Sequence, residues 1–265
     1  MLQMTITMFS QSLQRHTDVF VSLPPDPPSE EDQKSPYYQR PLKTILMLHG
    51  YNGSGRGVML TWNVQNFATK YNLAVVCASA ENSFYLNQKG TGRAYGDFFG
   101  IELPSFLRKH LGLFLSREDT LIAGFSMGGF GSLHVGMSHS EQFGGIIAVS
   151  SAMLPYSVAQ MKPGHNDTAD YDYYKQTFGE PGEVLQSTNN PEILLMNMKR
   201  EGHSIPPIYM ACGTEDMLFE HNQKFACFLR EQKISFRFDT EPGLHNQEFA
   251  IPHLDTGIRY LLSLS

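Results

Sequence analysis

The sequence contains little cysteine, no long apolar run and no clustered positive charge. Its 265 residues include three cysteines, Cys77, Cys212 and Cys227, an odd number without the paired spacing of a disulfide framework. The longest apolar runs, such as 44–48 and 145–149, have the length of a strand and fall far below the roughly 20 residues that a membrane-spanning helix needs. The sequence therefore predicts neither a disulfide-stabilised scaffold nor a membrane protein.

The charge of the chain and its first residues give expectations about its partners and its location. The 20 lysines and arginines are scattered among 26 acidic residues, which gives a formal net charge of −6. Nucleic-acid binding requires a basic patch or stripe, so we expect no nucleic-acid partner. Residues 1–10 lack the basic start, apolar stretch and small-residue cleavage site of a secretory signal, so we expect a cytoplasmic protein.

Short β-branched and aliphatic runs alternate with longer segments of helical spacing. The expected strands are 43–48, 73–78, 120–125, 145–150, 207–212 and 234–238, and the expected helices are 58–71, 98–111, 127–139, 217–232 and 247–262. An antiparallel hairpin of strands 3–9 and 18–23 precedes them and is followed by an exposed proline-rich loop at 24–41. This order predicts a single α/β domain over 1–265, with a mostly parallel eight-stranded sheet and helices on both faces.

The segment 153–204 interrupts the alternation, because it is polar and rich in tyrosine. Open α/β sheets bind ligands beside the carboxyl ends of their strands, so we interpret this segment as a small cap insertion over that edge. Its tyrosine rings can stack on a sugar or an aromatic acyl group, but simple packing explains them equally well. The candidate substrate contacts are Tyr156 and Tyr173 of the cap, together with Asn52.

The motif Gly-Phe-Ser-Met-Gly at 124–128 lies between a predicted strand and a predicted helix. A strand, a tight turn and a helix form the context in which Gly-x-Ser-x-Gly carries an exposed nucleophilic serine. Side chains in place of Gly124 and Gly128 would collide across such a turn. An ordinary glycine-rich turn is the alternative, and the flanking strand and helix argue against it. Ser126 is the candidate nucleophile.

A hydroxyl is a weak nucleophile, so it needs a base beside it and a carboxylate that orients the base. Asp216 follows the strand 207–212 and is the candidate acid. It is preferred to Glu215 because adjacent positions point to different sides. His245 follows the strand 234–238 and is the candidate base. Serine, aspartate and histidine in this order, each after a successive strand, follow the chain order of α/β-hydrolases.

Hydrolysis of an ester also needs a site for the negative oxygen that develops when the carbonyl is attacked. Residues 48–53, Leu-His-Gly-Tyr-Asn-Gly, follow the first core strand, and their glycines permit a turn that aims an amide at a bound carbonyl. We expect the backbone N–H groups of Tyr51 and Met127 to form this oxyanion hole. A simple turn at the end of the strand is the alternative for His49 and Gly50.

Four motifs together resemble the esterase D and tributyrin esterase group of α/β-hydrolases, which includes carbohydrate and feruloyl esterases. They are His-Gly at 49–50, the serine motif at 124–129, Cys-Gly-Thr-Glu-Asp at 212–216 and Pro-Gly-Leu-His at 242–245. The resemblance implies an α/β-hydrolase fold and hydrolysis of short-chain esters, such as acetyl or feruloyl esters of carbohydrates, without metal or organic cofactor. The polar residues 246–248 depart from the aromatic residues that often follow the histidine in this group.

Related enzymes leave two other reactions open. A thioesterase of the S-formylglutathione hydrolase type shares Ser-Met-Gly-Gly, and related mycolyl and homoserine acyltransferases use an alcohol in place of water. A metal enzyme is disfavoured, because no His-Glu-x-x-His occurs and His134 and His139 lack the four-residue spacing of one helix face. We therefore expect a serine carboxylesterase with a small-molecule or carbohydrate ester as its substrate. The sequence leaves open whether the chain forms a homo-oligomer.

Overall fold

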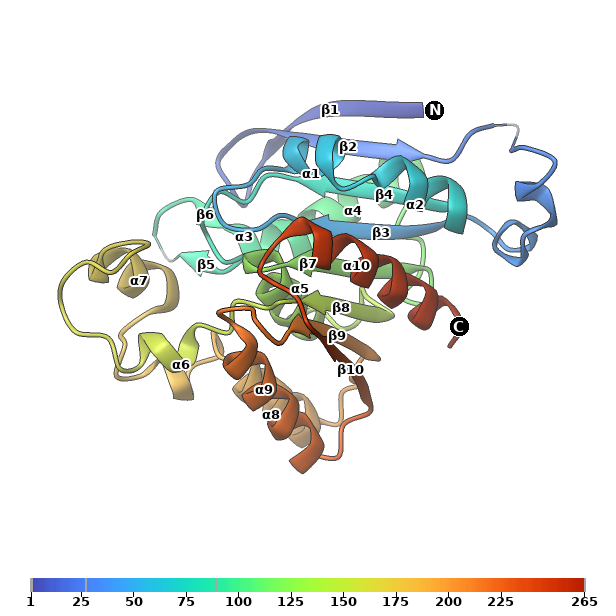
Figure 1. The fold of residues 1–265 in the computed structure, drawn as a ribbon. Helices are drawn as coiled ribbons and strands as arrows, with labels where there is room; N and C mark the ends of the chain where they lie inside the picture. The colour runs from blue at the N-terminus through green and yellow to red at the C-terminus, as the bar shows by residue number, and fades with distance from the viewer. Residues whose placement is uncertain (1, 27, 89, 265) are drawn as a thin grey trace.

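The computed structural model describes residues 2–26, 28–88 and 90–264 and arranges them around one large sheet (Figure 1). This sheet has eight strands in the order β1-β2-β4-β3-β7-β8-β9-β10. Their bounds are β1 Leu2–Ser10, β2 Arg15–Leu23, β3 Lys43–Leu48, β4 Leu73–Ala78, β7 Thr120–Phe125, β8 Gly145–Val149, β9 Ile208–Gly213 and β10 Phe236–Glu241. A second, two-stranded sheet pairs β5 Asn87–Gln88 with β6 Arg93–Ala94.

Helices cover both faces of the large sheet. Their bounds are α1 Gly55–Thr61, α2 Val64–Tyr71, α3 Tyr95–Asp97, α4 Leu103–Leu111, α5 Met127–Ser138, α6 Pro155–Val158, α7 Tyr171–Phe178, α8 Pro191–Glu201, α9 Phe219–Glu231 and α10 Gln247–Leu262. Short helices are the 3₁₀ turns η1 Asp32–Lys34, η2 Pro36–Gln39 and η4 Val184–Gln186 and the π-helix η3 Phe98–Glu102. In the described part of the chain, no helix combines the length and the apolar character needed to cross a membrane.

The alternation of side chains along buried strands produces a separate hydrophobic cluster on each face. Strands β3, β4, β8 and β9 are buried along their whole length, which explains why they are almost uniformly apolar. Ile45 of β3 packs in one cluster with Phe67 of α2, and its neighbour Leu46 packs in the other with Phe130 of α5. Helices α1, α2 and α10 thus cover one face, and α4, α5 and α9 cover the other.

The structure confirms the predicted α/β class and the mostly parallel eight-stranded sheet. The hairpin β1–β2 is antiparallel and joins β4 in antiparallel register, while the remaining neighbours are parallel. The prediction of one helix at 58–71 is wrong, because Asn63 has a left-handed φ of 54° and separates α1 from α2. The proline-rich loop at 24–41 contains the two short helices η1 and η2.

The segment 153–204 contains two kinds of structure. Helices α6 and α7 extend beyond the edge where the parallel strands end, whereas α8 lies beside α9 (Figure 1). Helix α8 contacts α5 and buries Leu195 and Met198 in the main core. The part of this segment that stands over the strand ends is therefore the stretch that precedes α8.

Candidate active site

Ser126 occupies the tight turn between β7 and α5. Its φ of 61° and ψ of −119° place a non-glycine residue in a strained conformation, which is typical of functional sites. The backbone is pinned there, since the Ser126 N–H donates to Val149 and its carbonyl accepts from Phe130. A Cβ on Gly128 would lie 2.0 Å from the Leu48 carbonyl oxygen, so this position must be glycine.

His245 and Asp216 reach Ser126 from the loops after β10 and β9. The His245 Nε2 atom lies 2.9 Å from Ser126 Oγ, and its Nδ1 atom lies 2.8 Å from Asp216 Oδ2. The two loops are joined by a backbone hydrogen bond of 3.1 Å from the Glu215 N–H to the Gly243 carbonyl. The ring of Phe125 stacks on the imidazole at a centroid distance of 4.6 Å. Strand ends that are far apart in sequence therefore bring the three predicted side chains into one hydrogen-bonded chain.

The carboxylate of Asp216 is fully buried, and the imidazole of His245 is 18% exposed. Burial raises the pKa of Asp216, but hydrogen bonds from His245 and from the Leu218 N–H outweigh it and hold the pKa below its ordinary value. The site thus contains an ionised carboxylate at neutral pH. Glu215 is exposed, so the structure brings Asp216 rather than its neighbour into the site.

Tyr51 and Met127, the residues predicted for the oxyanion hole, both line the cavity that contains Ser126. Within the described residues, neither Tyr51 nor Met127 donates its N–H to a protein acceptor, and both residues line the same cavity as Ser126. Met127 is the first residue of α5, where the free amides and the helix dipole favour a negative charge. Among the described residues, the two amides predicted for an oxyanion hole thus have no protein acceptor.

A cavity of about 350 Å³ opens between Ser126 and the segment that precedes α8. Most of its wall is apolar, and a few polar side chains stand among the apolar ones. Its lining residues are Tyr51, Phe84, Ser126, Met127, Ala152, Leu154, Ser157, Val158, Met161, Asn166, Thr168, Tyr174, Met217, Leu218 and His245. Such a mixture is typical of sites for small organic ligands.

The structure places the three predicted substrate contacts outside this cavity. Tyr156 donates its hydroxyl to Glu192, at 2.7 Å, and its ring lies under the Lys224 ammonium group. Tyr173 donates to the Asn82 carbonyl oxygen, at 2.6 Å, and the side chain of Asn52 pairs with that of Asn82. The polar groups of these three side chains thus have partners within the protein, and their role in substrate binding stays a prediction.

Tyr174 lines the cavity in place of its neighbour Tyr173, and the sequence analysis did not select it. Adjacent residues of a helix point in different directions, so only one of the two tyrosines can face the serine. The signal that could have identified Tyr174 is the spacing in α7, because Tyr174 and Phe178, four residues apart, are both buried on one face. Among the residues that the structure describes, no group of three potential ligands could hold a metal ion.

A mostly parallel sheet covered by helices on both faces, with a serine turn after its strand β7, defines the chain as an α/β-hydrolase. The family described as "Putative esterase" matches residues 10–250, and the chain belongs to this family. An acetyl esterase of Caldicellulosiruptor saccharolyticus is 34% identical over 263 residues, which cover 99% of this chain and 98% of that protein. The chain is a serine esterase, and these matches confirm the predicted resemblance.

Solved structures of two Staphylococcus aureus proteins share the fold. The fluorophosphonate-binding serine hydrolase FphF has a TM-score of 0.83 and 23% identity, with 98% of each chain covered. The S-formylglutathione hydrolase FrmB has a TM-score of 0.80 and 22% identity, again with 98% of each chain covered. At these identities the two likenesses establish the α/β-hydrolase fold alone.

Proposed function

We propose that the protein is a carboxylesterase for short-chain acyl esters, with Ser126 as nucleophile, His245 as general base and Asp216 as the acid that orients the base. The observation that carries the proposal is the unbroken hydrogen-bond chain from Asp216 through His245 to Ser126 at the wall of a cavity. The whole chain acts as one catalytic domain, and the part of 153–204 before α8 serves as the cap.

The reaction begins when Ser126 Oγ attacks the ester carbonyl carbon and His245 Nε2 takes the hydroxyl proton. Asp216 accepts a hydrogen bond from the Nδ1–H group of His245, which holds the tautomer in which Nε2 is free to act as a base. The carbonyl electron pair moves to its oxygen, which receives hydrogen bonds from the N–H groups of Tyr51 and Met127. The intermediate collapses, and the alcohol leaves with the proton from His245. Water then attacks the acyl-enzyme in the same way and releases the acid.

The identity of 34% to a protein described as an acetyl esterase favours a small acyl group, acetyl above all. The cavity of about 350 Å³ has an apolar wall, which includes Leu154, Met161 and Leu218 and can receive an acyl chain. Thr168 in the same wall offers its hydroxyl to the hydroxyls of a carbohydrate alcohol.

The proposal is tested by labelling with a fluorophosphonate probe and by hydrolysis of 4-nitrophenyl esters. Ser126→Ala should abolish labelling and lower kcat on 4-nitrophenyl acetate by at least about 10³-fold. Ser157→Ala is the matched control, since Ser157 lines the same cavity but bonds to His221 rather than to the triad. Labelling that survives in Ser126→Ala would refute the assignment.

The acyl preference is tested separately with a chain-length series. Acetate should be hydrolysed faster than octanoate, in line with the relative that is described as an acetyl esterase. S-formylglutathione in the same assay distinguishes an ester hydrolase from a thioesterase. A higher kcat/KM on the thioester than on every ester would replace carboxylesterase by thioesterase as the function.

A further inference from the structure

The oxyanion loop, residues 49–53, is held by a segment that plays no part in the triad. That segment, residues 80–85, follows β4 and is called the template segment below. The Ala80 N–H donates to His49 Nε2 at 2.8 Å, and the buried Tyr85 hydroxyl donates to the His49 carbonyl at 2.9 Å. The residue two positions before Tyr51 is thus fixed through both its ring and its backbone.

The same histidine sets the direction of the Tyr51 amide. His49 Nε2 accepts a hydrogen bond, so Nδ1 carries the proton of the neutral ring and donates it to the Gly50 carbonyl at 2.7 Å. The Gly53 N–H also donates to that carbonyl, at 3.0 Å. In a trans peptide the N–H points away from the C=O, so holding the Gly50 oxygen on the loop side directs the Tyr51 N–H away from it.

Asn82 of the template segment fixes the peptide on the other side of Tyr51. Its Oδ1 accepts from the Asn52 N–H at 2.8 Å, and its Nδ2 donates to the Asn52 side chain at 2.9 Å. Asn52 has a left-handed φ of 59°, a conformation that needs such local support. Both peptide planes that flank Tyr51 are therefore held by hydrogen bonds.

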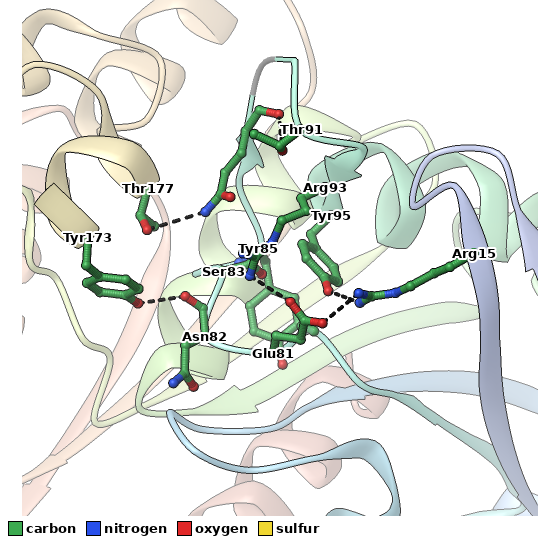
Figure 2. A network of polar contacts seen from close by, with 12 residues as sticks. Arg15, Glu81, Asn82, Ser83, Tyr85, Thr91, Arg93, Tyr95, Tyr173 and Thr177 are labelled. Atoms are coloured by element: carbon green, nitrogen blue, oxygen red, sulfur yellow. Dashed lines mark hydrogen bonds and ion pairs between the residues drawn. The ribbon is translucent and has the colours of Figure 1, made fainter. Parts of the chain in front are cut away.

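Asn82 also connects the oxyanion loop to the cap. Figure 2 shows the Tyr173 hydroxyl of α7 directed at the Asn82 carbonyl, at 2.6 Å. The ring of Tyr173 meets the ring of Tyr51 edge-on at a centroid distance of 6.0 Å, and Phe84 lies 6.3 Å from the same ring. One cap residue thus touches Tyr51 directly and holds the asparagine that supports its backbone.

The template segment is itself anchored to the rest of the fold. The Glu81 carboxylate lies between the Arg15 and Arg93 guanidinium groups, each 2.6 Å away (Figure 2). Glu81, Phe84 and Tyr85 all have positive φ, between 50° and 59°, which other contacts must stabilise. Asn82 therefore lies between Glu81, which is paired with Arg15 of β2 and Arg93 of β6, and the cap residue Tyr173.

We propose that Asn82 is a positioning residue for the oxyanion hole, and that Tyr173 couples the position of the cap to that hole through Asn82 and Tyr51. The inference rests on the proposed role of the Tyr51 N–H. An oxyanion forms only in the transition state and the intermediates, so loss of Asn82 lowers kcat and leaves ground-state binding unchanged. The cap residue thus influences catalysis without touching the substrate.

The test compares kcat and KM on 4-nitrophenyl acetate for Asn82→Ala and two related variants. Asn82→Ala should lower kcat about tenfold with KM within about twofold, which matches the loss of one or two hydrogen bonds. Asn82→Asp keeps an acceptor for the Asn52 N–H and should recover part of that loss. Tyr173→Phe keeps the ring on Tyr51 but removes the hydroxyl, so kcat should fall about threefold.

Asn87→Ala is the matched control. Asn87 lies shortly after the template segment and pairs with Asp97 rather than with the oxyanion loop, so its loss should leave kcat unchanged. The affinity for a trifluoromethyl ketone reports on the oxyanion hole itself, because the tetrahedral adduct of the ketone with the serine places an oxygen in that hole. Its affinity should fall in parallel with kcat/KM in Asn82→Ala while circular dichroism stays that of the wild type.

The two proposals fail in different ways. If Ser126→Ala is inactive and Asn82→Ala keeps the kcat and ketone affinity of the wild type, the positioning role is refuted and the esterase mechanism stands. If Ser126→Ala remains active, the proposed mechanism itself is refuted. An Asn82→Ala variant with raised KM and unchanged kcat would also overturn the inference, because it would make Asn82 a determinant of ground-state binding.

Discussion

The two sides of the active site are built in different ways. On the triad side, Ser126, Asp216 and His245 touch one another through side chains at the ends of β7, β9 and β10. On the oxyanion side, the loop after β3 presents a backbone amide, and its support comes from the template segment after β4 and from α7. The three triad side chains follow strand ends, whereas the loop after β3 also contacts the cap through Tyr173.

This difference teaches where single substitutions should be costly. A triad side chain has no replacement, because one group carries the proton or the charge. Several hydrogen bonds of similar kind hold the oxyanion loop. The loss of any one of them leaves the others in place, so the loop keeps most of its conformation. The expected losses of kcat therefore decrease from the triad to the template segment. Asp216→Asn and Tyr85→Phe below test the two ends of that decrease.

Among the substitutions that follow, the largest effect is expected for Asp216→Asn. The amide cannot stabilise the imidazolium, and its NH₂ group favours the wrong tautomer of His245, as in the serine protease triad. We expect kcat on 4-nitrophenyl acetate to fall about 10³- to 10⁴-fold. Steady-state kinetics at neutral pH, with circular dichroism to confirm the fold, measures this loss.

Glu215→Gln is the control for that substitution. Glu215 precedes Asp216 but is exposed, so its charge can be removed without reaching the site, and kcat should change less than about twofold. Equal losses in the two variants would mean that the negative charge of the loop, rather than the contact with His245, supports catalysis.

Acid should act first on buried histidines rather than on the triad carboxylate. The pKa of Asp216 is lowered, so its stabilising contribution is present above roughly pH 4, the unfolded value, and is lost only as pH falls further. Burial lowers the pKa of His49 on the oxyanion side and lowers that of His134 in α5 to about 4. These neutral histidines gain a proton on unfolding, so their contribution is lost as pH falls below about 6.5.

The free energy of unfolding should therefore decrease between pH 7 and pH 5, with a share of about 2 kcal/mol from His134. His134→Gln removes that share, so its loss of stability between the two pH values should be smaller by about this amount. Urea denaturation of both proteins at pH 7 and pH 5 measures the difference. An identical decrease in both would show that His134 is not neutral and buried in the folded state.

Much of the fold could be predicted because buried parallel strands have a simple sequence signature. The predicted bounds of β3, β4 and β7 agree with the structure, as do those of α10. The signature fails where a single residue changes the backbone direction. Asn63 interrupts the helix predicted at 58–71 through a left-handed φ, and apolar periodicity carries no information about that choice.

The triad could be proposed from the sequence because each residue directly follows a strand, and parallel strands end at one edge. The sequence does not predict which side chains face the cavity, since that depends on how α7 is rotated over the sheet. Tyr173 and Tyr174 are adjacent and chemically identical, yet only Tyr174 lines the cavity. The contact between Asn82 and Asn52 could not be predicted either, because the two residues lie 30 positions apart and belong to no sequence motif.

A much smaller loss of kcat than in Asp216→Asn is expected for Tyr85→Phe, which removes one support of the oxyanion loop. The His49 carbonyl loses the hydroxyl of Tyr85 as a donor in a buried site, which costs about 1–2 kcal/mol of folding stability. His49 keeps its contacts with Ala80 and Gly50, so kcat should fall only about three- to fivefold. Kinetics on 4-nitrophenyl acetate and urea denaturation measure the two effects.

Tyr209→Phe separates catalysis from stability in the same comparison. Tyr209 is a buried tyrosine of β9 whose hydroxyl bonds to Asp239, on the face of the sheet covered by α10. Its loss should lower stability by about 1 kcal/mol and leave kcat unchanged. If Tyr85→Phe and Tyr209→Phe reduce kcat equally, the reduction reflects the loss of overall stability, and the hydroxyl of Tyr85 does not specifically position the oxyanion loop. If only Tyr85→Phe does so, the loop owes part of its order to that hydroxyl.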